Sequence, residues 1–297
     1  MDSVKRRYIF LALTLLLVAV LVIVSVAIVL QGPRESSVEF VSKIGSTELT
    51  VNDMYEGEMT IPYFNIATNS YKPDKFLENK GVITYEGGDS FVGINVNSKK
   101  GDINWQQVKN SGVDYAMIRV GWRGDDNGII ALDEKFEDNI KGATEAGLPV
   151  GVYFYSKAVT DAEADEEAAF VLEQIRVYNV TYPVAFYWEY GTKDDGTLDE
   201  TKRTVRCNGD QVTGFIDTFC KKVKAAGHNA AYYCDKSMGY TKLNLATLSG
   251  YDMWYAEFRG APSFYYDFTM WQYTKSGTVP GIEEEVPINL CLKKYGK

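Results

Sequence analysis

Residues 93–124 read GINVNSKKGDINWQQVKNSGVDYAMIRVGWRG and contain one complete strand–helix–strand pattern. The apolar runs at 91–96 and 115–121 are typical of strands that are covered on both faces, as in a parallel sheet. The segment between them, 105–112, has the mixed apolar and polar pattern of an amphipathic helix and ends in Gly112, a common residue at helix ends. This stretch therefore predicts a βαβ unit.

The same alternation continues through most of the remaining chain. Helical patterns follow at 136–147, 161–178 and 209–227, and strand-like runs follow at 149–156, 183–190, 229–234, 251–258 and 268–274. Toward the C-terminus the helical segments fade and the strands follow one another closely. About eight strands that alternate with helices favour closure into a barrel.

The N-terminal region predicts a membrane anchor. Residues 8–30 carry no charge, and about 20 apolar residues span the hydrocarbon core of a bilayer. Lys5, Arg6 and Arg7 precede this segment, so the positive-inside rule places residues 1–7 in the cytoplasm and the rest outside. A cleaved signal peptide is the alternative, but its apolar region would be shorter and would end in small residues. Polar residues 31–90 are expected to form an extracytoplasmic stalk or a lead-in to the barrel domain at 91–297.

Composition excludes several classes of function. The 297-residue chain has a formal net charge of −9, which disfavours nucleic-acid binding because phosphate backbones attract clustered Lys and Arg. Its one histidine, His228, lies in a Gly- and Asn-containing turn, and the four cysteines lack the close spacing of zinc or redox sites. We expect no metal and no cofactor. Free buried thiols and one disulfide both remain open.

Polar and aromatic residues stand at the ends of the predicted strands. In a parallel barrel the carboxyl ends of the strands meet at one face, where ligands bind. This pattern is typical of a sugar-binding cleft, although a generic barrel mouth is also polar. The residues at these positions are Asn95, Asn97, Arg119, Tyr153, Tyr155, Tyr187, Glu189, Tyr233, Glu257, Trp271 and Tyr273.

Several of these segments resemble the family 25 glycoside hydrolases, the lysozymes that cleave peptidoglycan. Residues 93–124 resemble the family's opening, of the form GIDVSxxQGxIDW followed by a strand that ends in R-x-G. Residues 146–156, 182–190 and 252–258 resemble its later strands, and residues 264–290 resemble its ending, WQYTSSGxVxGIxGxVDLN. The resemblance implies an α/β (β/α)5(β)3 TIM-like barrel, here preceded by a transmembrane helix. It is closest to membrane-anchored or secreted versions from Gram-positive bacteria.

The resemblance also locates the catalytic positions, most of which are substituted. The first Asp of the family falls on Asn95, the Asp of its D-x-E motif falls on Tyr187, and the late Asp of VDLN falls on Pro287. The Glu of D-x-E, the general acid, is retained as Glu189. Among the residues at strand ends, we expect Tyr153, Arg119, Trp271, Tyr273 and Glu257 to bind substrate.

The substitutions predict impaired catalysis. Glycosidases stabilise an oxocarbenium-like transition state with two carboxyl groups, and losing one element of such electrostatics typically costs about 10²–10³ in rate. Asn95 and Pro287 carry no charge, and a tyrosine with an unperturbed pKa of about 10 is neutral at pH 7. Tyr187 paired with Glu189 could act as a nucleophile, as in sialidases, but a ring that fills an unused site is the favoured interpretation.

Two further residues have structural alternatives. Trp271 could stack on a sugar or pack in the core, and Glu257 could approach the cleft or serve as a structural partner. The acidic run at 283–285 could replace the lost late Asp, although such runs usually form solvated loops.

We therefore expect a membrane-tethered, lysozyme-like protein that binds peptidoglycan glycan strands without efficient hydrolysis. An active N-acetylmuramidase that uses Glu189 as its general acid is the first alternative. It would cleave the β-1,4 bond between N-acetylmuramic acid and N-acetylglucosamine. A scaffold that binds another envelope protein is the second alternative.

Overall fold

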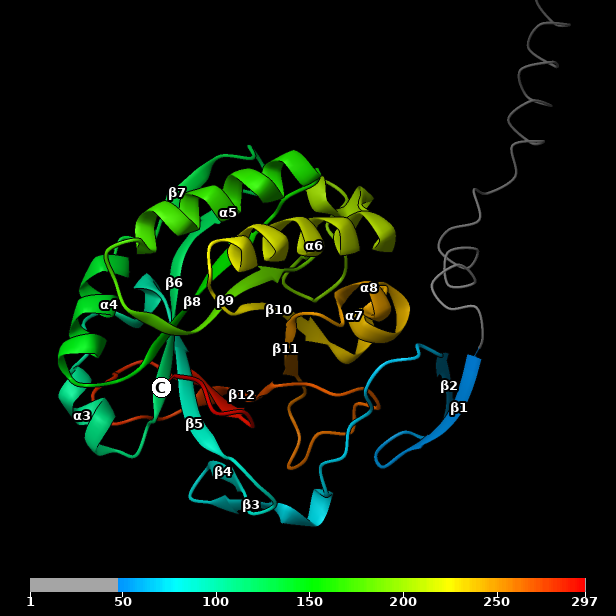
Figure 1. Cartoon of the computed structure of the whole chain (residues 1–297), viewed down its shortest axis with the longest axis horizontal. Helices are drawn as coiled ribbons and strands as arrows, with labels where there is room; N and C mark the ends of the chain where they lie inside the picture. The colour runs from blue at the N-terminus through cyan, green and yellow to red at the C-terminus, as the bar shows by residue number, and fades with distance from the viewer. Residues whose placement is uncertain (1–47, 297) are drawn as a thin grey trace, which may run out of the picture. The chain divides into compact units, whose positions relative to one another are not determined.

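The protein is described by a computed structural model over residues 48–296, in which a nine-stranded sheet closes on itself (Figure 1). The strand order is β5-β13-β12-β11-β10-β9-β8-β6-β7, and a further pairing of β5 with β6 completes the barrel. The short β7 pairs with β6 alone, in antiparallel orientation. The strands of this sheet are β5 (Phe91–Val96), β6 (Tyr115–Arg123), β7 (Ile130–Leu132), β8 (Val150–Ser156), β9 (Val180–Trp188), β10 (Ala230–Asp235), β11 (Asp252–Ala256), β12 (Met270–Gly277) and β13 (Val286–Cys291).

Helices connect the strands from β5 to β11, and their ends carry the expected capping residues. The side chains of Asn104, Thr160 and Asn208 each accept a hydrogen bond from a backbone N–H in the first turn of the helix that follows. Gly112 and Gly147 follow the ends of α3 and α4 with positive φ, a conformation that glycine adopts at no steric cost. The helices are α3 (Trp105–Asn110), α4 (Phe136–Glu145), α5 (Asp161–Ile175), α6 (Gly209–Ala225), α7 (Lys236–Thr241) and α8 (Leu245–Leu248).

The expected (β/α)5(β)3 TIM-like barrel is wrong for this chain, because the barrel is mixed and has few helices. Strand β13 runs antiparallel to both β12 and β5. No helix separates β11, β12 and β13: loops 257–269 and 278–285 connect them instead. An antiparallel neighbour can be reached through a short loop, whereas a parallel one needs a crossover of a dozen or more residues. The last strand therefore closes the barrel without a helix.

No helix between residues 48 and 296 is both long and apolar enough to cross a bilayer. The transmembrane helix expected at 8–30 lies outside the described residues.

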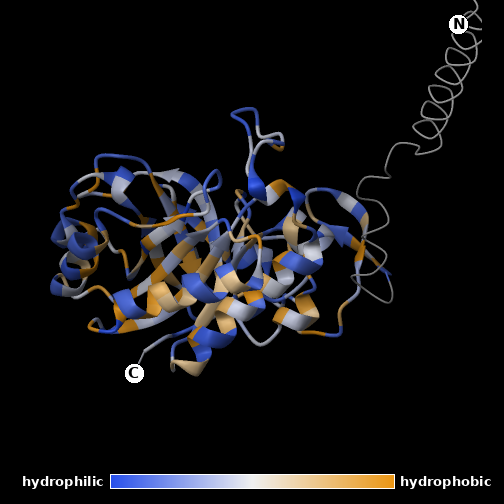
Figure 2. Cartoon of the chain, turned by 90° about the horizontal axis from the view of Figure 1, so that it is seen from above, coloured by the Kyte–Doolittle hydropathy of each residue, from blue (hydrophilic) through white to orange (hydrophobic). Residues whose placement is uncertain are grey.

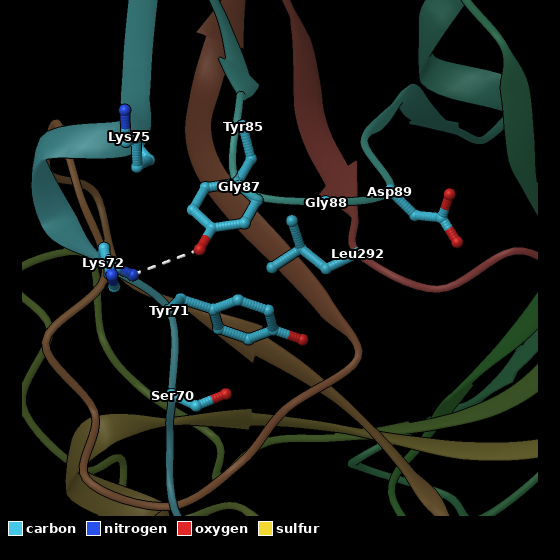
Figure 3. A pocket seen from close by; sticks show the side chains of 9 residues that line it. All are labelled: Ser70, Tyr71, Lys72, Lys75, Tyr85, Gly87, Gly88, Asp89 and Leu292. Atoms are coloured by element: carbon cyan, nitrogen blue, oxygen red, sulfur yellow. Dashed lines mark hydrogen bonds between the residues drawn. The ribbon is translucent and has the colours of Figure 1, made fainter.

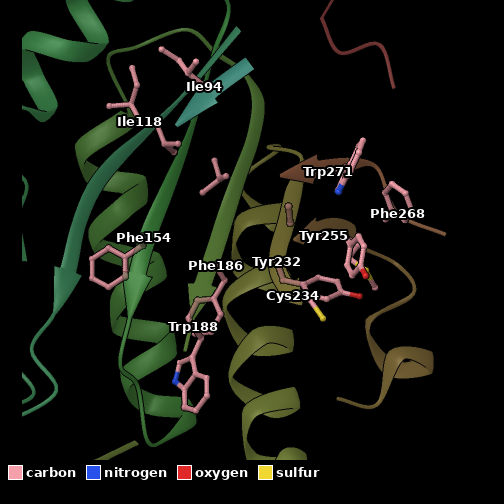
Figure 4. Close-up of a cluster of buried hydrophobic side chains, with 14 of the residues drawn as sticks. Ile94, Ile118, Phe154, Phe186, Trp188, Tyr232, Cys234, Tyr255, Phe268 and Trp271 are labelled. Atoms are coloured by element: carbon pink, nitrogen blue, oxygen red, sulfur yellow. The ribbon is translucent and has the colours of Figure 1, made fainter. Parts of the chain in front are cut away.

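Two hydrophobic clusters divide the side chains of the barrel strands. The outer cluster joins strand residues such as Ile118, Phe154 and Phe186 to apolar residues of the helices (Figure 4). The inner cluster contains residues such as Met117 and Trp254 and no helix residue, so it fills the barrel interior. Successive residues of a strand alternate between the two clusters, as the pleat requires. Figure 2 shows hydrophobic residues concentrated in the strands and hydrophilic ones in the loops.

Residues 48–90, expected to be a stalk or lead-in, contain two antiparallel hairpins that contact the barrel. The first pairs β1 (Glu48–Asp53) with β2 (Gly57–Pro62), and the second pairs β3 (Phe76–Asn79) with β4 (Val82–Tyr85). Phe76 packs edge-on against Trp271 of β12, with ring centroids 5.3 Å apart. The lead-in therefore covers the outer face of the last parallel strands.

The four cysteines, Cys207, Cys220, Cys234 and Cys291, are all buried and none forms a disulfide. Burial raises the pKa of Cys207 to about 11 and that of Cys291 to about 12, so these thiols stay protonated.

Candidate functional site

Glu189 lies at the carboxyl end of the parallel strands, immediately after β9. Its carboxylate accepts hydrogen bonds from two tyrosine hydroxyls, at 3.2 Å from Tyr155 of β8 and 3.3 Å from Tyr187 of β9. Tyr187 and Glu189 lie two positions apart and share the inner face, as the sequence predicted. Glu189, which the resemblance assigns as the general acid, is therefore at the barrel mouth, half-buried between tyrosines.

Lys157 fixes the backbone around Glu189. Its ammonium group donates a 2.7 Å hydrogen bond to the Glu189 carbonyl oxygen and lies 3.8 Å from the Asp125 carboxylate and 5.0 Å from the centroid of the Tyr155 ring. Burial lowers the pKa of Lys157 below its usual value. This lysine was not among the residues expected from the sequence.

Asn95 stands at the centre of a buried amide network. Its side-chain oxygen accepts hydrogen bonds from Gln272 Nε2 at 2.9 Å and from Asn289 Nδ2 at 3.1 Å. Asn289 in turn accepts one from Trp254 Nε1 at 2.9 Å, and Gln272 accepts one from the Tyr233 hydroxyl at 3.2 Å. A position that the resemblance assigns to a carboxylate thus belongs to a neutral network whose donors and acceptors satisfy one another.

Aromatic rings fill the space between Glu189 and this network. The Tyr187 ring lies 3.7 Å from the Tyr233 ring, centroid to centroid, and Trp254 packs edge-on against Tyr233 at 5.5 Å. Burial raises the pKa of Tyr187 well above its ordinary value, and the nearby Tyr233 and Glu189 raise it further. A nucleophilic tyrosine needs its phenolate form, so this environment disfavours such a role.

Pro287 lies on β13, two residues before Asn289 and therefore on the same face of that strand. It offers neither a side-chain acceptor nor a charge. The nearby residues 283–285 are exposed.

Arg119 and Tyr153 lie on the inner face but are already engaged. The Arg119 guanidinium donates to the buried Asp133 carboxylate at 2.7 Å and lies 4.8 Å from the Trp122 ring centroid. The Tyr153 hydroxyl donates to the Val96 carbonyl oxygen at 3.4 Å, and its ring packs against Tyr187 and Trp254.

The other three expected substrate-binding residues face outward. Trp271 and Tyr273 belong to the outer cluster. The Trp271 indole donates to the Glu257 carbonyl oxygen at 2.8 Å, and the Tyr273 hydroxyl accepts from the Ile83 backbone N–H at 3.2 Å. The Glu257 carboxylate bonds Lys236 and Ser263. We do not include these residues in the proposed cleft.

Gln272 and Asn289 are the site residues that sequence reasoning missed. Each is a polar residue inside an apolar strand, and each is flanked by residues that face outward. The alternation along β12, with Met270 in the inner cluster and Trp271 in the outer one, places Gln272 in the interior. An amide side chain inside such an apolar run was the signal in the sequence from which the interior positions of Gln272 and Asn289 could have been predicted.

Two hollows of the described chain lie away from this mouth. One, of about 330 Å³, lies in the lead-in, where Tyr71 and Tyr85 are flanked by Lys72, Lys75 and Asp89 (Figure 3). The other, about 630 Å³ and more open, lies beside α3 and α4. Glu189 and Asn95 line neither. Among residues 48–296 no group of three or more His, Cys, Asp or Glu side chains is arranged to hold a metal ion.

Comparisons with known proteins agree with the pattern of the sequence. The model of the family described as "Glycosyl hydrolases family 25" matches residues 94–282. The autolytic lysozyme of Clostridium acetobutylicum is 25% identical over 191 residues, which cover 64% of this chain and 52% of that protein. The chain thus spans about half the length of this curated relative.

Two solved structures are also similar. The modular autolysin LytC from Streptococcus pneumoniae, in complex with a synthetic peptidoglycan ligand, aligns with a TM-score of 0.58 and 22% identity over 83% of this chain and 58% of that one. The spore cortex lytic enzyme SleM from Clostridium perfringens aligns with a TM-score of 0.57 and 19% identity over 68% of this chain and 67% of that one. At these identities the likeness concerns the fold alone.

Proposed function

The chain belongs to the family 25 glycosyl hydrolases, and on that premise we propose that it binds peptidoglycan glycan strands at the barrel mouth without hydrolysing them efficiently. The observation that carries the proposal is the chemistry of the four acidic positions that the resemblance implies. Only Glu189 retains a carboxylate, and the site of the first Asp is occupied by Asn95 in a neutral network.

Electrostatics explains why a single acid is insufficient. A glycosidase needs one group to protonate the leaving oxygen and a second, anionic group to stabilise positive charge near the anomeric carbon. Asn95, Tyr187 and Pro287 supply no such charge. The Tyr187 ring also occupies the volume beside Glu189 in which the second group would act.

Two assays on the full-length chain in detergent test this proposal. We expect it to sediment with insoluble peptidoglycan and to leave peptidoglycan-containing gels uncleared. Each missing electrostatic element costs about 10²–10³ in rate, so any remaining clearing should be at least 100-fold below that of a working muramidase. The Glu189→Gln variant should behave like the unaltered chain, since the glutamine oxygen can accept from one tyrosine hydroxyl and its amide nitrogen can donate to the other.

Each rival function gives a different result in the same assays. Clearing that disappears in Glu189→Gln would indicate an active N-acetylmuramidase. Neither sedimentation nor clearing would indicate a scaffold that binds an envelope protein. Regained clearing after the combined changes Asn95→Asp, Tyr187→Asp and Pro287→Asp would identify the missing carboxylates as the cause of the loss.

We also propose that residues 8–30 anchor the chain in the cell membrane with residues 1–7 in the cytoplasm and the barrel outside. The uncharged 23-residue segment and the basic residues before it support this arrangement. Protease added to intact cells should then digest the barrel.

A further inference from the structure

The turn of the first hairpin is joined to the loop that follows β11. Asp53, the last residue of β1, bonds both Lys236 Nζ and Ser263 Oγ at 2.8 Å through one carboxylate oxygen. Lys236 also pairs with Glu257 at 3.0 Å, and Ser263 Oγ lies 2.8 Å from the same carboxylate. This part-buried set of bonds holds the hairpin turn against loop 257–263.

Tyr55, in the turn itself, is held in one orientation. Its hydroxyl donates to the Ala261 carbonyl oxygen at 2.9 Å and accepts from the Ala261 N–H at 3.2 Å. Its own N–H donates to Asp53 Oδ1 at 2.8 Å. The side chain nevertheless remains 40% exposed. A fixed and exposed ring can bind a ligand with little further loss of conformational entropy.

The same turn, the loop after β11 and the end of β12 carry exposed apolar and cationic groups, of which Arg259 lies beside this ring. Met54 is 50% exposed and Phe258 is 47% exposed. The Arg259 guanidinium lies 5.2 Å from the centroid of the Tyr55 ring, and Lys275 Nζ lies 4.9 Å from that of Phe258. Within residues 48–296 neither cation forms an ion pair. We call these five residues, Met54, Tyr55, Phe258, Arg259 and Lys275, the turn–loop surface.

We propose that the turn–loop surface binds glycan strands that carry carboxylates, and so extends the binding site beyond the barrel interior. The negative faces of aromatic rings attract the C–H groups of a pyranose, and the two cations can bind carboxylates of the attached peptides. Because the chain carries a net charge of −9, these two cations, which form no ion pair in the described part of the chain, are where the carboxylates of an anionic polymer would bind.

The position of the surface supports this assignment. Loop 257–263 directly follows β11 and therefore lies at the carboxyl end of the parallel strands, as Glu189 does. Tyr187 and Tyr233 fill the interior below the mouth, so a strand that binds at the mouth also needs contacts on its rim. Tyr55 and Met54 lie outside the family match at 94–282, so the family model does not account for this contact. The inference rests on the proposed glycan binding.

Sedimentation of the full-length chain in detergent tests the inference with two polymers. Insoluble peptidoglycan carries peptide carboxylates, whereas chitin is neutral. We expect Tyr55→Ala and Phe258→Ala each to weaken binding to both polymers roughly tenfold, a typical loss for a central aromatic contact. Arg259→Gln should weaken binding to peptidoglycan only, and most strongly at low salt, where charges are least screened.

Tyr63→Ala is the matched control, because Tyr63 is 42% exposed and follows the far end of β2, about 20 Å from the turn. The Phe258 side chain makes no hydrogen bond in the described structure, so Phe258→Ala keeps the loop intact even if Tyr55→Ala loosens it. If Phe258→Ala and Arg259→Gln bind the polymers as tightly as Tyr63→Ala does, this inference is wrong and the proposed function still stands. No binding by the unaltered chain would overturn the proposed function as well.

Discussion

The Asn95 side chain has a structural role in the barrel interior. Its oxygen accepts two amide hydrogen bonds, and those amides connect it to Trp254 and Tyr233 on other strands. A neutral acceptor fits this buried position without the cost of desolvating a charge. The residue therefore contributes to the stability of the barrel interior.

Replacing Asn95 by leucine should lower the free energy of unfolding by about 2–4 kcal/mol. The change leaves Gln272 Nε2 and Asn289 Nδ2 buried without their acceptor, and each unsatisfied group costs about 1–3 kcal/mol. Chemical denaturation followed by tryptophan fluorescence measures the loss. The exposed change Asn110→Ala, also at an asparagine, should stay within about 0.5 kcal/mol of the unaltered chain. Equal stability of Asn95→Leu and Asn110→Ala would argue against a structural role for the network.

At the scale of single residues, the sequence predicted that Tyr187 and Glu189 share the inner face. It assigned the other polar and aromatic residues to strand ends but to no face, because such residues at a strand end fit either face. The structure places Tyr153 and Arg119 on the inner face and Trp271, Tyr273 and Glu257 on the outer one. The choice depends on the register of β12 and on the lead-in that covers it, and both arise from contacts far apart in the chain.

An ion pair between Asp53 and Lys236 holds the β1–β2 hairpin against the barrel. Burial raises the pKa of Asp53, but hydrogen bonds from Lys236, Tyr55, Ser263 and Glu56 outweigh it and lower the pKa below 3.8. The folded state therefore favours the carboxylate form. This contribution to stability is complete above the unfolded-state pKa and is lost as pH falls through the folded-state value.

A comparison with Asp53→Asn should reveal this dependence. We expect the unaltered chain to melt at a higher temperature than Asp53→Asn at pH 6, because asparagine cannot form the ion pair with Lys236. The difference should shrink as pH falls below about 4, where the aspartate becomes protonated. Thermal melting at several pH values measures it. A difference that is independent of pH would show that the ion pair contributes nothing.

Local patterns predicted the central elements well. Residues 91–96 form β5 as expected, and the helical patterns at 161–178 and 209–227 correspond to α5 and α6. Strand β13 was missed, since Pro287 is unfavourable inside a strand and only its pairing with β5 and β12 defines it. The antiparallel closure follows from that pairing, which no local pattern encodes.

Considered as a whole, the folded chain is larger than the region that matches the family. Trp271 and Phe268 are fully buried, and Phe76 and Tyr71 of the lead-in pack against them with centroids 5.3 and 5.2 Å apart. Without residues 48–90 these rings would form an exposed apolar patch, which soluble proteins rarely tolerate.

A chain that begins at residue 91 should therefore aggregate or unfold without a cooperative transition. A matched chain that begins at residue 45 keeps both hairpins and should remain soluble with a single thermal transition. Calorimetry and binding of a hydrophobic dye distinguish the two. Equal melting temperatures for the two fragments would show that the lead-in is dispensable for folding.

The pairing of the first and last barrel strands also determines how the barrel responds to force. Phe91 lies opposite Cys291, and Ile94 lies opposite Ile288, so both ends of the barrel segment emerge at the same end of one ladder. Tension between these ends would load the hydrogen bonds one after another, as in a zipper, and not all at once. The barrel would open first between β5 and β13, at low force. The parallel strands, whose hydrogen bonds would be loaded together in shear, would resist a higher force.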